Sequence, residues 1–353
     1  MQHMIIKDEI RVPGSLADTY LETFLLDINE KFSVQERPLV LVCPGGGYHF
    51  TSEREAEIIA MQFNAMGYHT AVLRYSCAPA QFPTALLELS KAVAYLRSHA
   101  AEWKIDPDHI AVLGFSAGGH LAASLGVFWN TEWFAQIRAE LVASQTETER
   151  DAELVAYQAG LENSADLAAP QSETERDTEL AASQAGADEP MSDADKSVSG
   201  AGKSMSGAGK SQAGAWLTAE QIRPNGLILA YPVITSGEYA HRESFTNLLG
   251  EERGRDEKWL TKMSLEKQDV KDVPPAFVWH TSYDQSVPLE NSLYFVTELI
   301  KARKPVEYHI FPGDVHGIGL ADWRTRSQER PEDTAAVQWI PLAHAWLEKW
   351  KEG

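Results

Sequence analysis

One serine in the chain lies in a pattern that fits a nucleophile. Residues 114–118 read Gly-Phe-Ser-Ala-Gly, after an apolar run at 109–113 and before a helix-compatible run at 120–125. Between a strand and a helix, this pattern is typical of a strained turn that holds the serine hydroxyl at the carboxyl end of the strand. We therefore predict that Ser116 is a nucleophile with the backbone N–H of Ala117 beside it, rather than a solvated serine in a glycine-rich turn.

A serine hydroxyl is a poor nucleophile until a base takes its proton, and that base needs an acid to orient it. Asp284 follows an apolar run at 276–279, and His316 follows another at 306–311. Catalytic residues gather in such loops because the carboxyl ends of parallel strands meet at one edge of a sheet. We predict that Asp284 is the acid and His316 the base. The alternatives, an aspartate in an Asx turn and a histidine on a surface loop, remain open at this point.

Other acids and histidines occupy positions that suit catalysis less well. Asp314 is too close to His316 in the sequence to replace an acid on the loop of the preceding strand. Asp272 comes before its strand and therefore lies at the opposite end of the sheet. We predict structural roles for His120, His309 and His280, the last as a support for the loop of Asp284.

A glycine run precedes the serine motif, at the end of another predicted strand. Residues 44–48 read Pro-Gly-Gly-Gly-Tyr and follow the apolar run at 39–43. A tetrahedral intermediate needs N–H donors for its oxyanion, and successive glycines let backbone amides turn inward without obstruction by side chains. The position of this run matches an oxyanion loop, so we predict one here rather than a flexible turn.

Composition narrows the classes of function. The chain has 353 residues, 44% of them hydrophobic, with a net charge of −20 and an isoelectric point near 5.0. The acidic excess argues against nucleic acid or an anionic membrane surface as a partner. The two cysteines, Cys43 and Cys77, form no zinc signature, and no dinucleotide-binding glycine motif follows a strand. We therefore expect no metal and no cofactor.

The expected location is cytoplasmic. The first nine residues lack the apolar core of a signal peptide, and no run approaches the ~18 apolar residues of a membrane span. Two cysteines provide no disulfide framework, which fits a reducing compartment.

The segment 131–216 differs in composition from the rest of the chain. It carries 16 acidic and 6 basic side chains, about half of the net charge of −20, and the sequence at 147–160 recurs with changes at 173–186. Repeats so short and polar cannot stack a core, so we predict a flexible, low-complexity insertion. The Gly-Lys-Ser triplets at 202–204 and 209–211 lack the upstream glycine and the strand of a P-loop, so we predict no phosphate site there.

Strand-like and helix-like segments alternate on both sides of this insertion, which predicts an α/β fold with a mostly parallel twisted sheet and helices on both faces. We assign residues 1–130 and 217–353 to a single domain that the insertion interrupts. The predicted strands span 5–12, 19–26, 38–43, 68–75, 109–114, 226–232, 276–280 and 306–311, the first two as an antiparallel pair. The predicted helices span 54–66, 83–101, 117–128, 289–303 and 334–350. Ser52 and Glu55 have the spacing of a capping box for the first of these helices.

Four motifs together resemble those of bacterial α/β-hydrolase esterases. They are Pro-Gly-Gly-Gly-Tyr at 44–48, Gly-Phe-Ser-Ala-Gly-Gly-His at 114–120, His-Thr-x-x-Asp-x-x-Val-Pro at 280–288 and His-Gly at 316–317. The resemblance is closest to the acetylxylan-esterase-like, BD-FAE-type group, which is related to hormone-sensitive-lipase-like esterases. It covers about residues 5–130 and 217–350. Pro44 follows the pattern of this group and departs from the lipase-like one.

The resemblance implies an α/β-hydrolase fold and removal of acetyl groups from acetylated sugars, such as xylo-oligosaccharides, by an intracellular enzyme. By the positions of the matching motifs, the resemblance implies that Ser116 is the nucleophile, Asp284 the acid and His316 the base. The implied oxyanion donors are the amides of Gly46, Gly47 and Ala117. The insertion at 131–216 lies outside the resemblance, which leaves its role as a lid and the presence of an oligomer open.

Other functions remain open at this point. A general short-chain carboxylesterase, or a serine peptidase or amidase, would use the same triad. Prolyl-peptidase relatives carry a large extra β domain, for which the chain ahead of the hydrolase pattern is too short. A scaffold protein that works through the acidic repeats would usually lack a triad member. Five aromatic residues near predicted strand ends are candidates for an apolar or sugar-stacking wall: Tyr48, Phe50, Trp129, Tyr231 and Trp323.

Overall fold

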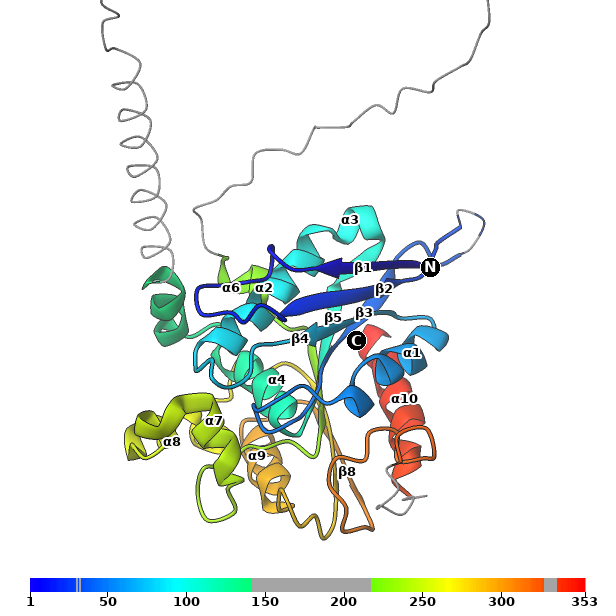
Figure 1. Ribbon diagram of the computed structural model, residues 1–353. Helices are drawn as coiled ribbons and strands as arrows, with labels where there is room; N and C mark the ends of the chain where they lie inside the picture. The colour runs from blue at the N-terminus through cyan, green and yellow to red at the C-terminus, as the bar shows by residue number, and fades with distance from the viewer. Residues whose placement is uncertain (30, 32, 141–216, 327–334, 353) are drawn as a thin grey trace, which may run out of the picture. The chain divides into compact units, whose positions relative to one another are not determined.

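Eight strands form one sheet in the computed structural model, which describes residues 1–29, 31, 33–140, 217–326 and 335–352 (Figure 1). The strands are β1 (Gln2–Ile6), β2 (Tyr20–Leu25), β3 (Arg37–Cys43), β4 (His69–Arg74), β5 (Ile105–Phe115), β6 (Gly226–Ala230), β7 (Ala276–Thr281) and β8 (Val306–Phe311). Their order across the sheet is β1-β2-β4-β3-β5-β6-β7-β8. Strand β2 pairs antiparallel with β1 and β4, and the other neighbours are parallel. The predicted mostly parallel sheet is confirmed.

Strand β3 shows why the central strands read as unbroken apolar runs. All of its residues from Pro38 to Cys43 are buried. Successive side chains of a strand point to opposite faces. Accordingly, Leu39 and Leu41 belong to the apolar cluster on one face of the sheet, and Val40 and Val42 belong to the cluster on the other. A parallel strand covered on both sides needs apolar residues at every position.

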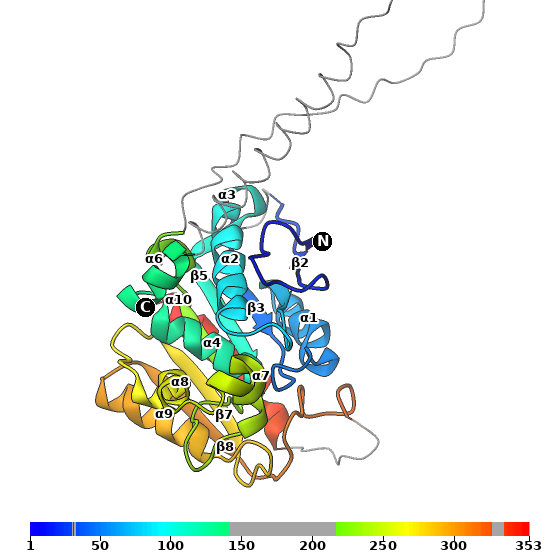
Figure 2. The ribbon, with the colours of Figure 1, turned by 60° about the vertical axis from the view of Figure 1, so that its left-hand side comes forward.

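Helices supply the two layers that cover the sheet (Figures 1 and 2). One apolar cluster receives side chains from α2 (Thr84–Ser98), α4 (Ser116–Phe128) and α9 (Glu290–Lys301). The opposite cluster receives side chains from α1 (Glu57–Ala65) and α10 (Trp339–Glu352). Further helical elements are η1 (Glu53–Glu55), α3 (Ala100–Trp103), α6 (Ala219–Ile222), α7 (Arg242–Arg253), α8 (Glu257–Met263), η3 (Leu265–Lys267) and η4 (Ala336–Gln338).

Three differences from the predicted elements matter for the site. The first strand ends at Ile6 because a backbone turn begins at Lys7, whose carbonyl accepts the amides of Ile10 and Arg11. The first main helix starts at Glu57, after the short η1 turn. Helices α7 and α8, between β6 and β7, were not predicted, because their residues are mostly polar and carry no long apolar stripe.

The described part of the chain belongs to one compact unit, residues 1–141 and 216–353. Residues 132–140 are helical, and Phe134 and Arg138 are buried, so the first ten residues that we assign to the insertion pack with this unit. The repeats at 147–160 and 173–186 and the Gly-Lys-Ser triplets lie outside the described residues. Among the described helices, none combines the length and the apolar character that a membrane crossing requires.

Candidate active site

Ser116 lies at the turn from β5 into α4 and has a φ of 51°, a left-handed conformation that non-glycine residues rarely adopt. The backbone around it is too close for side chains at two motif positions. A Cβ on Gly114 would lie 2.2 Å from the carbonyl oxygen of Gly118, and a Cβ on Gly118 would lie 2.2 Å from that of Cys43. The motif glycines therefore permit the turn that presents the Ser116 hydroxyl at the end of β5.

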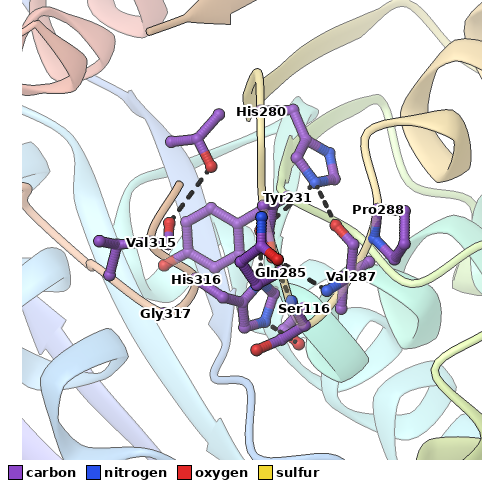
Figure 3. A network of polar contacts seen from close by, with 12 residues as sticks. Ser116, Tyr231, His280, Gln285, Val287, Pro288, Val315, His316 and Gly317 are labelled. Atoms are coloured by element: carbon purple, nitrogen blue, oxygen red, sulfur yellow. Dashed lines mark hydrogen bonds and ion pairs between the residues drawn. The ribbon is translucent and has the colours of Figure 1, made fainter. Parts of the chain in front are cut away.

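His316 connects the hydroxyl of Ser116 to the carboxylate of Asp284. Its Nε2 lies 2.7 Å from Ser116 Oγ (Figure 3), and its Nδ1 lies 2.7 Å from Asp284 Oδ2. Because a carboxylate accepts hydrogen bonds, Nδ1 carries the proton and donates it, which leaves Nε2 to accept from the serine hydroxyl. The structure thus brings together the three residues that the motifs select, in an arrangement that can withdraw the serine proton.

Asp284 is buried and oriented by its own loop. Its Oδ1 accepts the amides of Ser286 and Val287, each at 2.9 Å. Burial acts to raise the pKa of Asp284, but the hydrogen bonds and charges of His280 and His316 outweigh burial and hold this pKa well below its usual range. The carboxylate therefore stays ionised at neutral pH and faces His316.

His280 has the supporting position expected for it. Its Nε2 donates to the carbonyl of Val287 at 2.9 Å (Figure 3) and lies 3.5 Å from Asp284 Oδ2. Its Nδ1 is hydrogen-bonded to the hydroxyl of Ser292 on α9. The buried ring therefore ties the Asp284 loop to the strand end and to a helix.

The glycine loop after β3 lies against the same cleft as Ser116. Gly46 and Gly47 have φ values of 128° and 64°, and a Cβ on Gly46 would lie 2.1 Å from the carbonyl oxygen of Phe50. Across the described ranges, the Gly46 and Gly47 amides donate no hydrogen bond to the protein. Ala117 is in the first turn of α4, where amides have no partner within the helix. These three amides remain our proposed oxyanion donors.

Glu55 has a different role from the one its spacing suggested. Ser52 makes no side-chain capping hydrogen bond, so the predicted capping box is wrong. Glu55 is instead buried, and its Oε2 accepts the Gly45 amide at 2.9 Å while its Oε1 accepts the Tyr231 hydroxyl at 2.7 Å. Tyr231 is 176 residues away in the sequence, and no local pattern reveals such a contact.

A cleft of about 340 Å³ opens beside Ser116 and His316. The side chains around it are mostly polar, and they include His49, Arg54, His241 and Glu243. Phe50 also lines the cleft and has 57% of its surface exposed. A second hollow of about 260 Å³ shares His49 and Phe50 with this cleft. The space next to the nucleophile therefore has room for a small group and offers it both polar side chains and one aromatic ring.

The other aromatic candidates for a wall are placed elsewhere. Tyr48 and Trp129 are buried, and Trp323 is 75% exposed but lines neither hollow. Tyr231 is buried with its ring edge-on to the imidazole of His316, at 4.9 Å between centroids. Only Phe50 of the five can meet a substrate in the cleft.

His241 reaches the cleft from the residue before α7, a position that sequence reasoning missed. Its Nδ1 lies 2.8 Å from the hydroxyl oxygen of Ser244. Burial lowers the pKa of His241, and His316 lowers it further, against the opposing charges of Glu243 and Asp284. The ring is therefore uncharged at neutral pH and can exchange hydrogen bonds with a substrate.

The remaining histidines and acids lie away from the reacting groups. His120 is buried and bonded to the Tyr48 hydroxyl and the Met263 carbonyl, each at 2.9 Å. His309 pairs with Glu307 at 2.8 Å on β8. Asp314 is exposed, and Asp272 accepts from Asn130. Within the described residues, no group of three His, Cys, Asp or Glu side chains could hold a metal ion.

Known proteins resemble this chain in sequence and in fold. The BD-FAE family profile matches residues 26–199, and that of the prolyl oligopeptidase family matches residues 227–335. The crystal structure of the acetyl ester-xyloside bifunctional hydrolase from Caldicellulosiruptor lactoaceticus has a TM-score of 0.64 and 27% sequence identity. The superposition covers 98% of this chain and 96% of the chain in that crystal structure. The chain has the α/β-hydrolase fold.

Two curated proteins are also similar to this chain. The chain is 28% identical over 296 residues to endo-1,4-beta-xylanase B of Butyrivibrio fibrisolvens. This alignment covers 81% of the chain and 33% of the relative. The chain is 20% identical over 284 residues to the acetylxylan esterase of Xylanibacter ruminicola. This alignment covers 79% of the chain and 41% of the relative. The chain thus spans about a third of the length of the first relative and about two fifths of the length of the second. The predicted resemblance to α/β-hydrolase esterases is confirmed.

Proposed function

We propose that this protein hydrolyses carboxylic esters through an acyl-enzyme on Ser116, and that its natural substrates are acetylated sugars such as xylo-oligosaccharides. One observation carries the proposal: His316 lies 2.7 Å from both Ser116 Oγ and Asp284 Oδ2. A neutral imidazole in this position can act as a general base and then as a general acid.

The acylation half-reaction follows from these contacts. As Ser116 Oγ attacks the ester carbonyl carbon, its proton passes to His316 Nε2, and Asp284 stabilises the imidazolium. The amides of Gly46, Gly47 and Ala117 stabilise the negative charge on the carbonyl oxygen. When the intermediate collapses, the bond to the alcohol oxygen breaks, and the alcohol leaves with the proton from His316.

The deacylation half-reaction repeats these steps with water. His316 takes a proton from a water molecule whose oxygen attacks the acyl carbon on Ser116. Collapse of the second intermediate breaks the bond to Oγ, which regains its proton from His316, and the carboxylic acid leaves.

Two observations support acetylated sugars. The cleft is small, and its side chains include several that can bond to sugar hydroxyls, among them His49, Arg54 and Glu243. The names of the relatives from B. fibrisolvens, X. ruminicola and C. lactoaceticus refer to xylan, acetylxylan and acetyl xyloside chemistry. A small acyl group next to a polar alcohol fits this cleft better than a long acyl chain does.

Initial rates on p-nitrophenyl acetate, butyrate and octanoate, beside acetate release from acetylated xylo-oligosaccharides, test the proposal. We expect fast acetate release from the sugar and rates that fall steeply with acyl length. A preference for octanoate without sugar deacetylation would make the protein a general carboxylesterase on the same triad. Ser116→Ala should lower kcat by about 10³-fold or more, and a variant that keeps a tenth of the activity would overturn the role of Ser116.

An amide substrate is the second candidate, because the prolyl oligopeptidase family profile matches residues 227–335, which include Asp284 and His316. Peptidases and esterases share this triad, so the match alone does not separate them. Hydrolysis of p-nitroanilides as fast as that of acetyl esters would favour the amide substrate; we expect rates far below those on esters.

A further inference from the structure

A buried carboxylate connects the two loops that meet at the cleft. Glu55 exposes 2% of its surface, and its Oε2 accepts the amide of Gly45 at 2.9 Å, at the start of the glycine loop. Its Oε1 accepts the hydroxyl of Tyr231 at 2.7 Å, and the oxygen of Tyr231 in turn accepts the amide of Gly319 at 3.0 Å. A chain of hydrogen bonds therefore runs from the glycine loop to the segment that follows His316.

The same short turn contacts the His316 loop a second time. Nη1 of Arg54, the residue before Glu55, donates to the carbonyl of Gly317 at 3.1 Å. The ring of Tyr231 lies edge-on to the His316 imidazole at an angle of 66° (Figure 3). The element η1 thus contacts Gly317 directly through Arg54. Through Glu55 it contacts Tyr231, which bonds to Gly319 and packs against the base.

The carboxylate has little freedom to move. A Cβ on Gly45 would lie 2.6 Å from Glu55 Oε2, so the glycine loop passes directly over the acid. Burial, together with the charge and hydrogen bond of Glu55, raises the pKa of Tyr231 well above its ordinary value. The tyrosine therefore keeps its proton, donates it to Glu55, and leaves its oxygen free to accept from Gly319.

We infer that Glu55 is a positioning residue that fixes the oxyanion loop relative to His316, a role that rests on the proposed function. Oxyanion donors and a general base act on the same intermediate, so a small shift of one relative to the other weakens transition-state binding. A carboxylate suits this position because each of its two oxygens accepts from a different loop. An amide side chain has a single acceptor and must present N–H to one of the two donors.

Glu55→Gln tests this role with nearly unchanged shape, and Glu53→Gln is the matched control. Glu53 is exposed in the same η1 turn and lines neither hollow. On p-nitrophenyl acetate we expect E55Q to lower kcat by roughly tenfold to a hundredfold, less than the loss of an oxyanion donor itself, with KM changed by less than about twofold. E53Q should match the wild type in both constants.

A trifluoromethyl ketone separates positioning from a purely structural effect. This inhibitor forms a tetrahedral adduct with a nucleophilic serine, and its oxyanion needs the same donors as the reaction. If Glu55 positions the loop, the affinity of E55Q for the ketone falls in parallel with kcat. If part of the protein merely fails to fold, the concentration of active sites falls while the affinity of the remaining sites stays at the wild-type value, which would overturn the inference.

Tyr231→Phe provides a second variant that keeps the ring and removes the middle of the chain of hydrogen bonds. We expect a loss of kcat similar to that of E55Q. Because both changes break the same connection, the double variant should lose little more than the worse single variant. Additive losses would show that the two residues act separately and would contradict the connection.

The proposed function and this inference fail in different ways. If Ser116→Ala retains activity, the reaction does not use Ser116 and the proposed function fails. If Ser116→Ala is inactive while E55Q keeps kcat and ketone affinity within about twofold of the wild type, the proposed function stands and the positioning role of Glu55 is wrong.

Discussion

Asp284 and His316 are joined at 2.7 Å through one oxygen of the carboxylate, while its other oxygen accepts two backbone amides. This division fixes more than a distance. The amides of Ser286 and Val287 require an acceptor, so an aspartate or asparagine side chain at position 284 places an oxygen atom toward them. What then faces Nδ1 of His316 decides which nitrogen of the imidazole carries the proton.

Asp284→Asn should therefore reverse the tautomer. The asparagine carbonyl will face the two amides, and its NH₂ group will face His316 Nδ1, which must then accept. The proton moves to Nε2, which can no longer take the serine proton. We expect kcat to fall on the order of 10⁴-fold with little change in fold.

Asp314→Asn is the matched control, because Asp314 is exposed and two residues from His316. Its kcat on p-nitrophenyl acetate should equal that of the wild type. If D314N loses as much activity as D284N, the loss reflects a general sensitivity of the loop, and the specific role of Asp284 would be wrong.

The residues around Ser116 could be predicted because their signals are local. Gly114 and Gly118 belong to one short motif, in which Gly114 permits a close approach within the turn and Gly118 permits one to the end of β3. Asp284 and His316 each follow a recognisable strand. The strands themselves could be located because burial on both faces makes them apolar at every position, as in β3.

Glu55 and His241 could not be predicted, because their positions depend on contacts between distant segments. Glu55 has the local spacing of a helix cap, but its contacts are with Gly45 and with Tyr231, which directly follows β6 and lies 176 residues later in the chain. His241 precedes α7, whose polar sequence gave no periodic signal. That the segment 131–216 is a flexible insertion stays a prediction beyond residue 140, since those residues lie outside the described part.

The close backbone contact at Gly118 predicts a strong effect for Gly118→Ala. The new Cβ would lie 2.2 Å from the carbonyl of Cys43 and 2.3 Å from that of Pro44, and backbone atoms cannot yield as a flexible side chain can. We expect a loss of about 3 kcal/mol in the free energy of unfolding, measured with denaturant, together with a large loss of kcat.

Gly126→Ala on the same helix is the control for this effect. Its Cβ would lie 2.6 Å from a methyl group of Leu227, the end of a flexible side chain. Alanine also favours the helix by about 1 kcal/mol over glycine. The net change should be small, so equal destabilisation by both variants would contradict the special closeness of the elbow.

Two buried histidines predict how stability depends on pH. Burial lowers the pKa of His120 and of His69 to about 4, from an ordinary value of 6.5. Each ring already donates to a carbonyl through Nε2 and accepts through Nδ1: His120 from the Tyr48 hydroxyl and His69 from the Leu26 amide. A second proton would place a donor against the Leu26 amide at His69, and at His120 it would force the Tyr48 hydroxyl to turn its own proton away.

The direction of the change in the free energy of unfolding follows from how many protons the folded and the unfolded chain bind. Between pH 6.5 and about 4 the unfolded chain binds protons that the folded histidines do not, so the free energy of unfolding falls as the pH falls. Each histidine contributes at most about 1.4 kcal/mol per pH unit in this window. Denaturant unfolding of the wild type and of His120→Gln across this range measures the effect, and an equal slope in the two proteins would contradict it.

The position of Phe50 predicts a contribution of this residue to the preference for acetylated sugars over simple esters. It is 57% exposed at the edge that the cleft beside Ser116 shares with the second hollow, a position where an aromatic ring can stack on a sugar while the acetyl group reaches the serine. Phe50→Ala should lower kcat/KM about fivefold more on acetylated xylo-oligosaccharides than on p-nitrophenyl acetate, which is too small to fill both hollows. Trp323→Ala is the control, because Trp323 is 75% exposed yet lines neither hollow. An equal loss on both substrates for F50A would mean that the ring only supports the oxyanion loop, and a selective loss for W323A would place the sugar on another surface.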